Sequence, residues 1–241
     1  MARLLSVLCL FSLTLVYVRA QTCKKPADVA ILLDASGSIG RKRWPKVAAF
    51  TKSLVNSFGV SEEGSHFAVV MYATNTAVVV DFDDFTGAAR TPENINAKID
   101  EVDYNEWKGM TYIDRGLDTA NRMVFTEENG MRPDKKKILI LFTDGKQTKT
   151  RDPYTELDIA AQPLKAKGVE IHALGIGKKG KIDVDELGSM ATKPEYVYTA
   201  ESFDDLLPMA LRIIELSCDL PRKTTSVKYN AQGNFLSHLF T

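Results

Sequence analysis

Continuous apolar runs alternate along this chain with segments in which apolar residues recur at helical spacing. The clearest runs cover residues 27–33, which end in Asp34, and residues 137–142. Runs of this length, bounded by turn-forming residues, are typical of strands buried on both faces of a parallel sheet. Shorter runs predict further strands at 66–73, 76–82, 169–174 and 196–199.

Helices are predicted between these strands. In the segment 44–58, for example, Val47, Phe50, Leu54 and Val55 share one helical face. The other predicted helices cover 91–102, 112–125, 158–167, 183–190 and a final segment that Ser202 caps, in which Pro208 predicts a kink. Strands alternate with helices throughout, so the fold class is α/β. The hairpin-like turn Thr74-Asn75 predicts one antiparallel strand at the edge of the sheet.

The two ends of the chain differ from this alternation. Arg3, an apolar stretch at 4–16 and small residues before Gln21 predict a signal peptide at 1–20. Periodicity lapses after residue 218, which predicts a flexible tail at 219–241 and one domain at 21–218. We therefore expect a secreted protein without membrane insertion; an uncleaved signal anchor is the alternative.

Charge and cysteines narrow the class of protein further. The chain has 31 basic and 31 acidic residues, and loss of Arg3 and Arg19 with the signal peptide leaves it slightly acidic. A nearly neutral chain argues against nucleic acid as a partner. Cys23 and Cys218 bracket the predicted domain, and in an oxidising compartment they are most simply one disulfide, with intermolecular pairing as the alternative.

One carboxylate and two hydroxyls follow the first buried run. Asp34, Ser36 and Ser38 alternate at intervals of two, so an extended loop directs all three side chains to one side. These hard oxygen donors suit Mg²⁺ rather than zinc or copper. The alternative is a helix cap followed by a turn, positions that Ser and Asp also favour.

This Asp-x-Ser-x-Ser pattern after a hydrophobic strand resembles the metal-ion-dependent adhesion site of von Willebrand factor type A (VWA) domains. That family includes the inserted domains of integrin α chains, the matrilins and type VI collagen. Its site also takes a Thr and an Asp from two later loops, and Thr111 and Asp144 follow here in the expected order. The resemblance spans about residues 24–218 and implies a doubly wound sheet with helices on both faces. It assigns the metal to Asp34, Ser36, Ser38, Thr111 and Asp144.

The resemblance also implies a function. A bound Mg²⁺, with Mn²⁺ or Ca²⁺ as alternatives, would offer an open position to an acidic side chain of a collagen or another extracellular-matrix protein. Around it we expect a ligand-binding rim at Gly37, Arg41, Arg43, Tyr112 and Gly145. The competing interpretation of the basic and aromatic residues is a solvated helix start with Trp44 in the core. Met110 and Ile113 depart from residues common in the family and affect the shape of the rim.

Two other classes of function are weighed against adhesion. In the main alternative, the chain is a structural matrix or mineral-associated component. It would act by self-assembly, or by glycosaminoglycan binding through the basic residues 41–43 or the acidic segment 81–84. We do not expect an enzyme, because nothing places His66, His172 or His238 near the serines as a base. The glycine-rich segment 175–182 partly matches nucleotide-binding loops, but we interpret it as a strand-to-helix turn.

Overall fold

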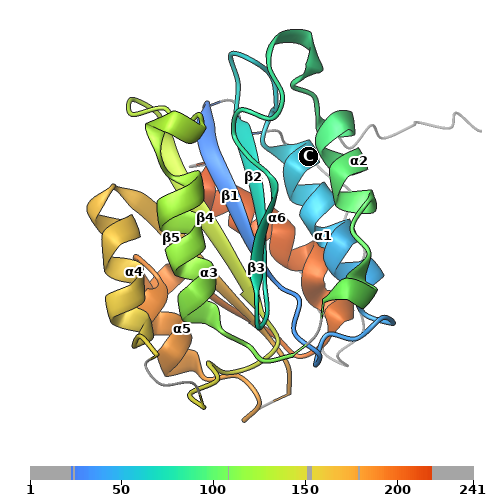
Figure 1. Ribbon diagram of the computed structural model, residues 1–241, viewed down its shortest axis with the longest axis vertical. Coiled ribbons are helices and arrows are strands. Elements are labelled where there is room, and N and C mark those ends of the chain that lie inside the picture. The colour runs from blue at the N-terminus through green and yellow to red at the C-terminus, as the bar shows by residue number, and fades with distance from the viewer. Residues whose placement is uncertain (1–22, 24, 108, 151–153, 179, 219–241) are drawn as a thin grey trace, which may run out of the picture.

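The chain forms one six-stranded sheet with strand order β3-β2-β1-β4-β5-β6. The computed structural model describes residues 23, 25–107, 109–150, 154–178 and 180–218 (Figure 1), so the predicted signal peptide and tail lie outside the described residues. The strands are β1 (Ala27–Asp34), β2 (His66–Tyr72), β3 (Thr76–Val80), β4 (Lys136–Thr143), β5 (Val169–Ile176) and β6 (Val197–Ala200). All neighbouring strands pair in parallel except β2 and β3. The predicted antiparallel edge strand is confirmed.

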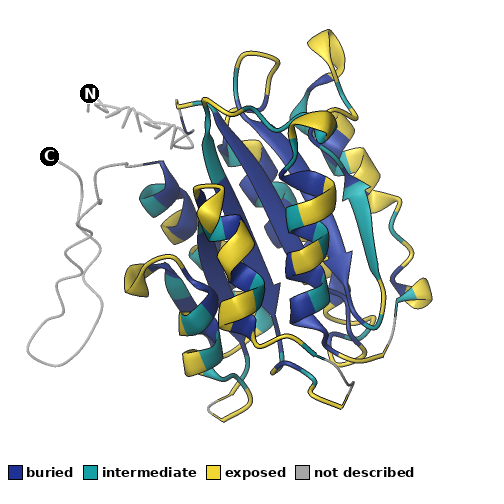
Figure 2. Cartoon of the chain, turned by 60° about the vertical axis from the view of Figure 1, so that its left-hand side comes forward, coloured by how far each residue is buried: buried dark blue, intermediate teal, exposed yellow. Residues whose placement is uncertain are grey.

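Helices cover both faces of the sheet (Figure 1). On one face lie α1 (Trp44–Ser57), α2 (Pro92–Asp100) and α6 (Leu206–Ser217); on the other lie α3 (Ile113–Thr119), α4 (Leu157–Ala166) and α5 (Val184–Met190). Figure 2 shows the sheet buried between helices whose outer sides are exposed. The doubly wound α/β prediction is therefore confirmed.

Two helices differ in detail from their predicted form. The helix expected at 112–125 is α-helical only to Thr119 and continues as a π-turn, Ala120–Val124. The last helix begins with a 3₁₀ turn, Phe203–Asp205, so Pro208 lies in the first turn of α6. A proline there removes no intrahelical hydrogen bond, and α6 is one continuous helix to Ser217.

The order of the strands explains where a site can form. β1 and β4 are adjacent and parallel, with Leu33 opposite Phe142, so both carboxyl ends reach the same edge. The chain winds outward in opposite directions from this pair, which makes the edge beyond it a topological switch point. We call this the carboxyl edge; it is the lower edge in Figure 1.

The opposite edge holds the ends of the domain together. Cys23, before β1, is bonded to Cys218, at the end of α6, with their Cα atoms 5.4 Å apart. The predicted intramolecular disulfide is therefore present. Among the described residues, no helix is both long and apolar enough to span a bilayer.

Candidate metal site at the carboxyl edge

Asp34 ends β1 and begins the loop that carries the two serines. Its side chain is fully buried. One carboxylate oxygen accepts the Ser36 N–H at 2.8 Å, and the other accepts the Thr143 hydroxyl at 2.9 Å. The end of β4 therefore fixes the orientation of the carboxylate at the end of β1.

Asp144 brings the second buried carboxylate to the same place. It follows β4 directly and is also fully buried. The Ser38 hydroxyl donates a short hydrogen bond to Asp144 Oδ1, and the Ser36 and Ser38 hydroxyl oxygens lie 3.0 Å apart. Asp34, Ser36, Ser38 and Asp144 thus form one hydrogen-bonded cluster, from loops more than a hundred residues apart.

Thr111 reaches this cluster on a third loop. The Gly37 N–H donates to the Gly109 carbonyl at 3.2 Å, which joins the Thr111 loop to the serine loop. On the other side, Gly145 is so close that a Cβ added to it would lie 3.7 Å from Thr111 Oγ1. The structure therefore brings together all five residues that the resemblance assigns to the metal.

Two polar residues after Asp144, which the sequence analysis did not single out, hold the Thr111 loop in place. Thr148 accepts the Thr111 N–H at 3.1 Å and donates its own N–H to the Thr111 carbonyl at 2.9 Å. Gln147 Oε1 accepts the Ile113 N–H at 2.7 Å, while its amide nitrogen donates to Asp114 at 2.9 Å. Gln147 therefore caps the start of α3 from another loop. It lies more than thirty residues along the chain from Ile113 and Asp114, so no local sequence pattern predicts this role.

The aromatic residues near the site are buried and support its loops; they do not form part of an exposed rim. The Tyr104 hydroxyl donates to the Ser36 carbonyl at 2.6 Å and accepts the Gly40 N–H at 2.8 Å, so it holds the serine loop from behind. Trp44 stacks on the Tyr104 ring, with centroids 5.3 Å apart, and is buried. Tyr112, predicted for the rim, is only 8% exposed, and its ring is covered by the Arg115 guanidinium.

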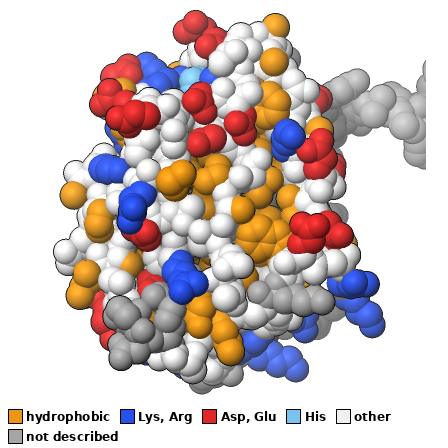
Figure 3. All heavy atoms as spheres, viewed as in Figure 1, with side chains coloured by type: hydrophobic (Ala, Val, Ile, Leu, Met, Phe, Trp, Pro, Cys, Tyr) orange, Lys and Arg blue, Asp and Glu red, His pale blue; other side chains and the backbone are white. Residues whose placement is uncertain are grey.

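Of the other predicted rim residues, Gly37, Arg43 and Gly145 contact the loops that form the cluster, and Arg41 lies two positions before Arg43. Gly37 and Arg41 are exposed and Gly145 is half-buried. Arg43 turns toward the carboxylates: its guanidinium donates to the Ser38 carbonyl at 2.7 Å and lies 3.9 Å from Asp144 Oδ2. Figure 3 shows Lys and Arg side chains along the lower right of the molecule, next to this edge. The rim is therefore less aromatic than the sequence suggested.

A further cation at the site was not predicted. The Lys181 ammonium lies 3.0 Å from Asp144 Oδ2. It comes from the glycine-rich segment after β5, where α5 begins only at Val184 and is capped by Asp183. This segment is therefore a strand-to-helix turn, as interpreted from the sequence, but one that contacts the candidate site.

The electrostatics of the cluster fit a hard divalent cation. Burial, with a smaller contribution from the Asp144 charge, raises the pKa of Asp34 to about 6. Lys181 pairs with Asp144, but Asp34 is held by neutral donors, and a buried carboxylate is costly unless a cation compensates it. Both carboxylates also neighbour hydroxyls, and no group of three His, Cys, Asp or Glu side chains in the described part of the chain forms a competing metal site. Two carboxylates and three hydroxyls suit Mg²⁺, Mn²⁺ or Ca²⁺.

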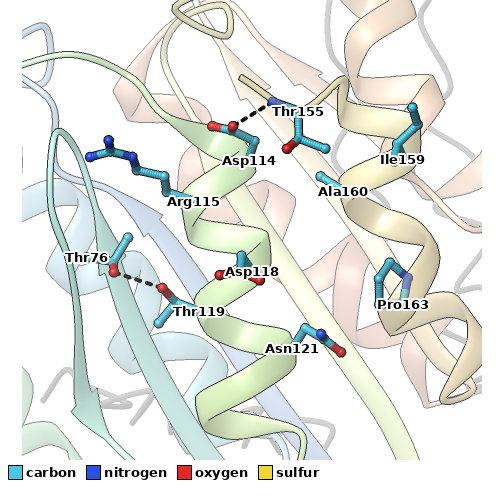
Figure 4. A pocket seen from close by; sticks show the side chains of 10 residues that line it. All are labelled: Thr76, Asp114, Arg115, Asp118, Thr119, Asn121, Thr155, Ile159, Ala160 and Pro163. Carbon is cyan, nitrogen blue, oxygen red and sulfur yellow. Dashed lines mark hydrogen bonds between the residues drawn. The ribbon is translucent and has the colours of Figure 1, made fainter. Parts of the chain in front are cut away.

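A cavity of about 520 Å³ lies elsewhere, between α3 and α4 (Figure 4). Asp114 and Arg115 line it at one end, and Asp114 accepts the Thr155 N–H there at 3.0 Å. Ile159, Ala160 and Pro163 form its α4 wall. Among the described residues, the lining has no imidazole beside a nucleophile and no group of three His, Cys, Asp or Glu side chains. The candidate site is therefore the carboxyl-edge cluster and not this cavity.

Fold and site together define a doubly wound α/β domain with an oxygen-donor cluster at its topological switch point. A model of the von Willebrand factor type A domain matches residues 28–210. The chain belongs to this VWA family, as its motifs predicted.

Similar proteins include several from the extracellular matrix. Vitrin from Mus musculus is 29% identical over 201 residues, covering 83% of this chain and 28% of vitrin. The collagen alpha-5(VI) chain from Mus musculus is 28% identical and covers 83% of this chain but 7% of the collagen chain. This chain therefore spans only part of the relatives it matches.

A solved structure with this fold is proximal thread matrix protein 1 from the mussel byssus. Its TM-score is 0.74 and its identity 32%, covering 83% of this chain and 49% of the mussel chain. Another structure of the same protein has a zinc-occupied metal-ion-dependent adhesion site. The preference for magnesium over zinc that donor types alone suggested is therefore not shared by every such site.

Proposed function

We propose that this chain is a secreted binding module that captures an acidic side chain of an extracellular-matrix protein through a divalent cation. The observation that carries the proposal is the meeting of two fully buried carboxylates, Asp34 and Asp144, with the hydroxyls of Ser36, Ser38 and Thr111. The cation we propose is Mg²⁺, with Mn²⁺ or Ca²⁺ as alternatives. The partner we propose is a collagen or a similar matrix protein.

The neutral and the charged side chains of the cluster have different proposed roles. Ser36, Ser38 and Thr111 are neutral donors that would leave most of the cation's positive charge uncompensated, while Asp34 and Asp144 would bind it or orient the hydroxyls. When bound, the cation supplies a coordination position that a partner carboxylate can fill. Arg43, beside the cluster, adds a fixed positive charge that attracts the same carboxylate.

The residues favour binding over catalysis. His66 begins β2 and lies at the edge opposite the serines. His172 lies within β5 and is hydrogen-bonded to the Tyr198 hydroxyl at 2.9 Å. Neither imidazole is hydrogen-bonded to Ser36 or Ser38 as a general base would be. His238 lies outside the described residues.

The localisation agrees with this role. The relatives include a collagen chain and a byssus matrix protein, which confirms the extracellular-matrix localisation expected for this chain. Within the proposal, residues 1–20 are a signal peptide that is removed, the VWA domain covers 21–218, and 219–241 form a tail.

A solid-phase screen against collagens and other matrix proteins tests the proposal. Binding is expected in Mg²⁺ or Mn²⁺, and at least about tenfold weaker in EDTA, which removes the cation, or in Asp34→Asn, which removes one of its carboxylates. Glu63→Gln is the matched control, since Glu63 is an exposed acid outside the carboxyl edge. Binding that survives both EDTA and Asp34→Asn would contradict the proposal and favour the alternative, a structural component acting by self-assembly or glycosaminoglycan binding.

A further inference from the structure

Lys181 is placed so that it neutralises a carboxylate proposed to serve the metal. The Asp144 side chain is fully buried, with Oδ1 accepting from Ser38 and Oδ2 paired with the Lys181 ammonium at 3.0 Å. Lys181 itself is 44% exposed. The ammonium therefore reaches from the surface to an acid that has no contact with solvent.

Glycines in the segment after β5 make this contact geometrically possible. A Cβ on Gly175 would come within 2.5 Å of Ile182 Cγ2, and one on Gly177 within 3.1 Å of Lys181 Cδ. The turn folds back over the end of β5, with the Lys181 N–H donating to the Lys178 carbonyl at 3.0 Å. The glycines that imitate a nucleotide-binding pattern thus leave room for the Lys181 stem to lie along the backbone toward Asp144.

The other cation near Asp144 is held differently. Arg43 lies farther away, at 3.9 Å from Oδ2, and its guanidinium is fixed by the Ser38 carbonyl and by the Phe203 ring beneath it. Lys181 carries its charge on a flexible four-carbon stem. Of these two cations, Lys181 is the one that can leave Asp144 without breaking another contact described in the structure.

We infer that Lys181 is an internal counter-cation that competes with the divalent cation for Asp144 and so lowers the affinity of the site for metal. The inference rests on the proposed metal site. Any divalent cation bound by Asp144, directly or through water, must either displace the ammonium or accept a positive charge a few ångströms away, and both weaken its binding. Once displaced, the ammonium remains beside a cavity of about 410 Å³. The cavity is lined by the cations Arg43, Lys46 and Lys178 and by the acids Glu201 and Asp204, so the ammonium adds to a net positive charge facing an acidic partner.

Titration calorimetry with Mn²⁺ on the full mature chain tests the inference. Lys181→Gln is expected to bind Mn²⁺ about tenfold more tightly than the wild type, because the positive charge that competes for Asp144 is removed. Lys178→Gln is the matched control, because Lys178 is an exposed lysine of the same turn that lines the same cavity, and it is expected to stay within about twofold. Equal or weaker Mn²⁺ binding by Lys181→Gln would overturn the inference.

Thermal unfolding provides an independent readout. In EDTA, Lys181→Gln is expected to melt several degrees below the wild type, because Asp144 stays buried without its ammonium. Saturating Mn²⁺ is expected to remove that difference, because the metal stabilises the variant more. A difference that is the same with and without Mn²⁺ would show that Lys181 only stabilises the turn, and would overturn the inference. If folded wild type and Lys181→Gln both bind no Mn²⁺, the proposed function itself fails.

Discussion

The two ends of β1 each hold a fully buried aspartate, but the two are compensated in opposite ways. Asp28, at the start, accepts the Arg132 backbone N–H at 2.6 Å and is paired with the Arg132 guanidinium at 2.7 Å. Asp34, at the other end, is held by the Ser36 and Asp144 N–H groups and by the Thr143 hydroxyl, which are all uncharged donors. The charge of a buried acid that is paired with a cation is already neutralised. A buried acid held only by neutral dipoles is not neutralised, and it therefore favours binding of a cation.

The surroundings of the two ends follow the same division. At the Asp28 end, the disulfide joins the chain ends, and the Lys136 ammonium donates to the Ser217 carbonyl at 2.9 Å and pairs with Glu170 at 3.1 Å. At the Asp34 end, loops from three parts of the sequence meet, and the additional positive charge comes from Lys181 and Arg43. The Asp28 edge is held by a disulfide and ion pairs, and we call it the fastened edge; the Asp34 edge carries the candidate metal site. We therefore expect that stability and metal binding can be changed separately.

The largest expected effect comes from the fastened edge. Replacing both Cys23 and Cys218 with Ser is expected to lower the free energy of unfolding by about 5 kcal/mol, because the bond closes a very long loop in the unfolded chain. Urea unfolding of oxidised wild type and variant measures the loss. Mn²⁺ affinity of the folded variant is expected to stay within about twofold of wild type. A large gain in affinity would show instead that α6, which the disulfide holds at its end, communicates with the carboxyl edge.

Removal of the counter-ion of Asp28 ranks next. Arg132→Met is expected to cost about 3–5 kcal/mol in unfolding free energy, because Asp28 remains buried without its cation. Arg122→Met is the matched control, since its ion pair with Asp118 is largely exposed, and it should cost less than about 1 kcal/mol.

Two results sharpen the comparison of the edges. Asp28→Asn combined with Arg132→Met is expected to recover part of the loss, because the isolated charge is removed. Mn²⁺, which we propose to bind at the other edge, is expected to give the same stabilisation in Arg132→Met as in wild type. Metal that specifically rescues Arg132→Met would contradict the division between the two ends.

The sequence predicted much of this architecture because its signals are local. The apolar runs of β1 and β4 identified the centre of the sheet, and Thr74-Asn75 identified the antiparallel edge. The five predicted metal ligands lie together because each follows, or faces, a strand end that the fold brings to one edge. Their binding of metal stays a prediction.

What the sequence did not predict depends on side chains meeting over long separations. Arg132 pairs with an aspartate 104 positions away, and no spacing rule relates the two. Lys181 reaches Asp144 only because the turn folds back over Gly177, which is a matter of three-dimensional shape. Aromatic residues posed a different difficulty: Tyr112 was predicted for the rim, and the structure buries it.

The smallest effect concerns a buried group between the two edges that carries no charge. His172 lies in β5, stacked on Tyr196 and hydrogen-bonded to Tyr198, and burial, with the nearby Lys136 and Lys193 charges, lowers its pKa to about 3. Its pKa in the unfolded chain is the ordinary 6.5. Below about pH 6.5, therefore, His172 is protonated in the unfolded chain but stays neutral in the folded protein, so stability falls as pH falls.

Between pH 7 and pH 5 this proton uptake is expected to cost about 2 kcal/mol, because each pH unit below the unfolded pKa costs about 1.4 kcal/mol. Urea unfolding at a series of pH values measures it, and His172→Gln, which cannot be protonated, should flatten the profile. The same profile in saturating Mn²⁺ should be shifted upward without losing the His172 contribution, since His172 belongs to the scaffold and not to either edge. If His172→Gln leaves the slope unchanged, another group titrates in this range; His66, whose pKa is also lowered by burial, is then the residue to replace.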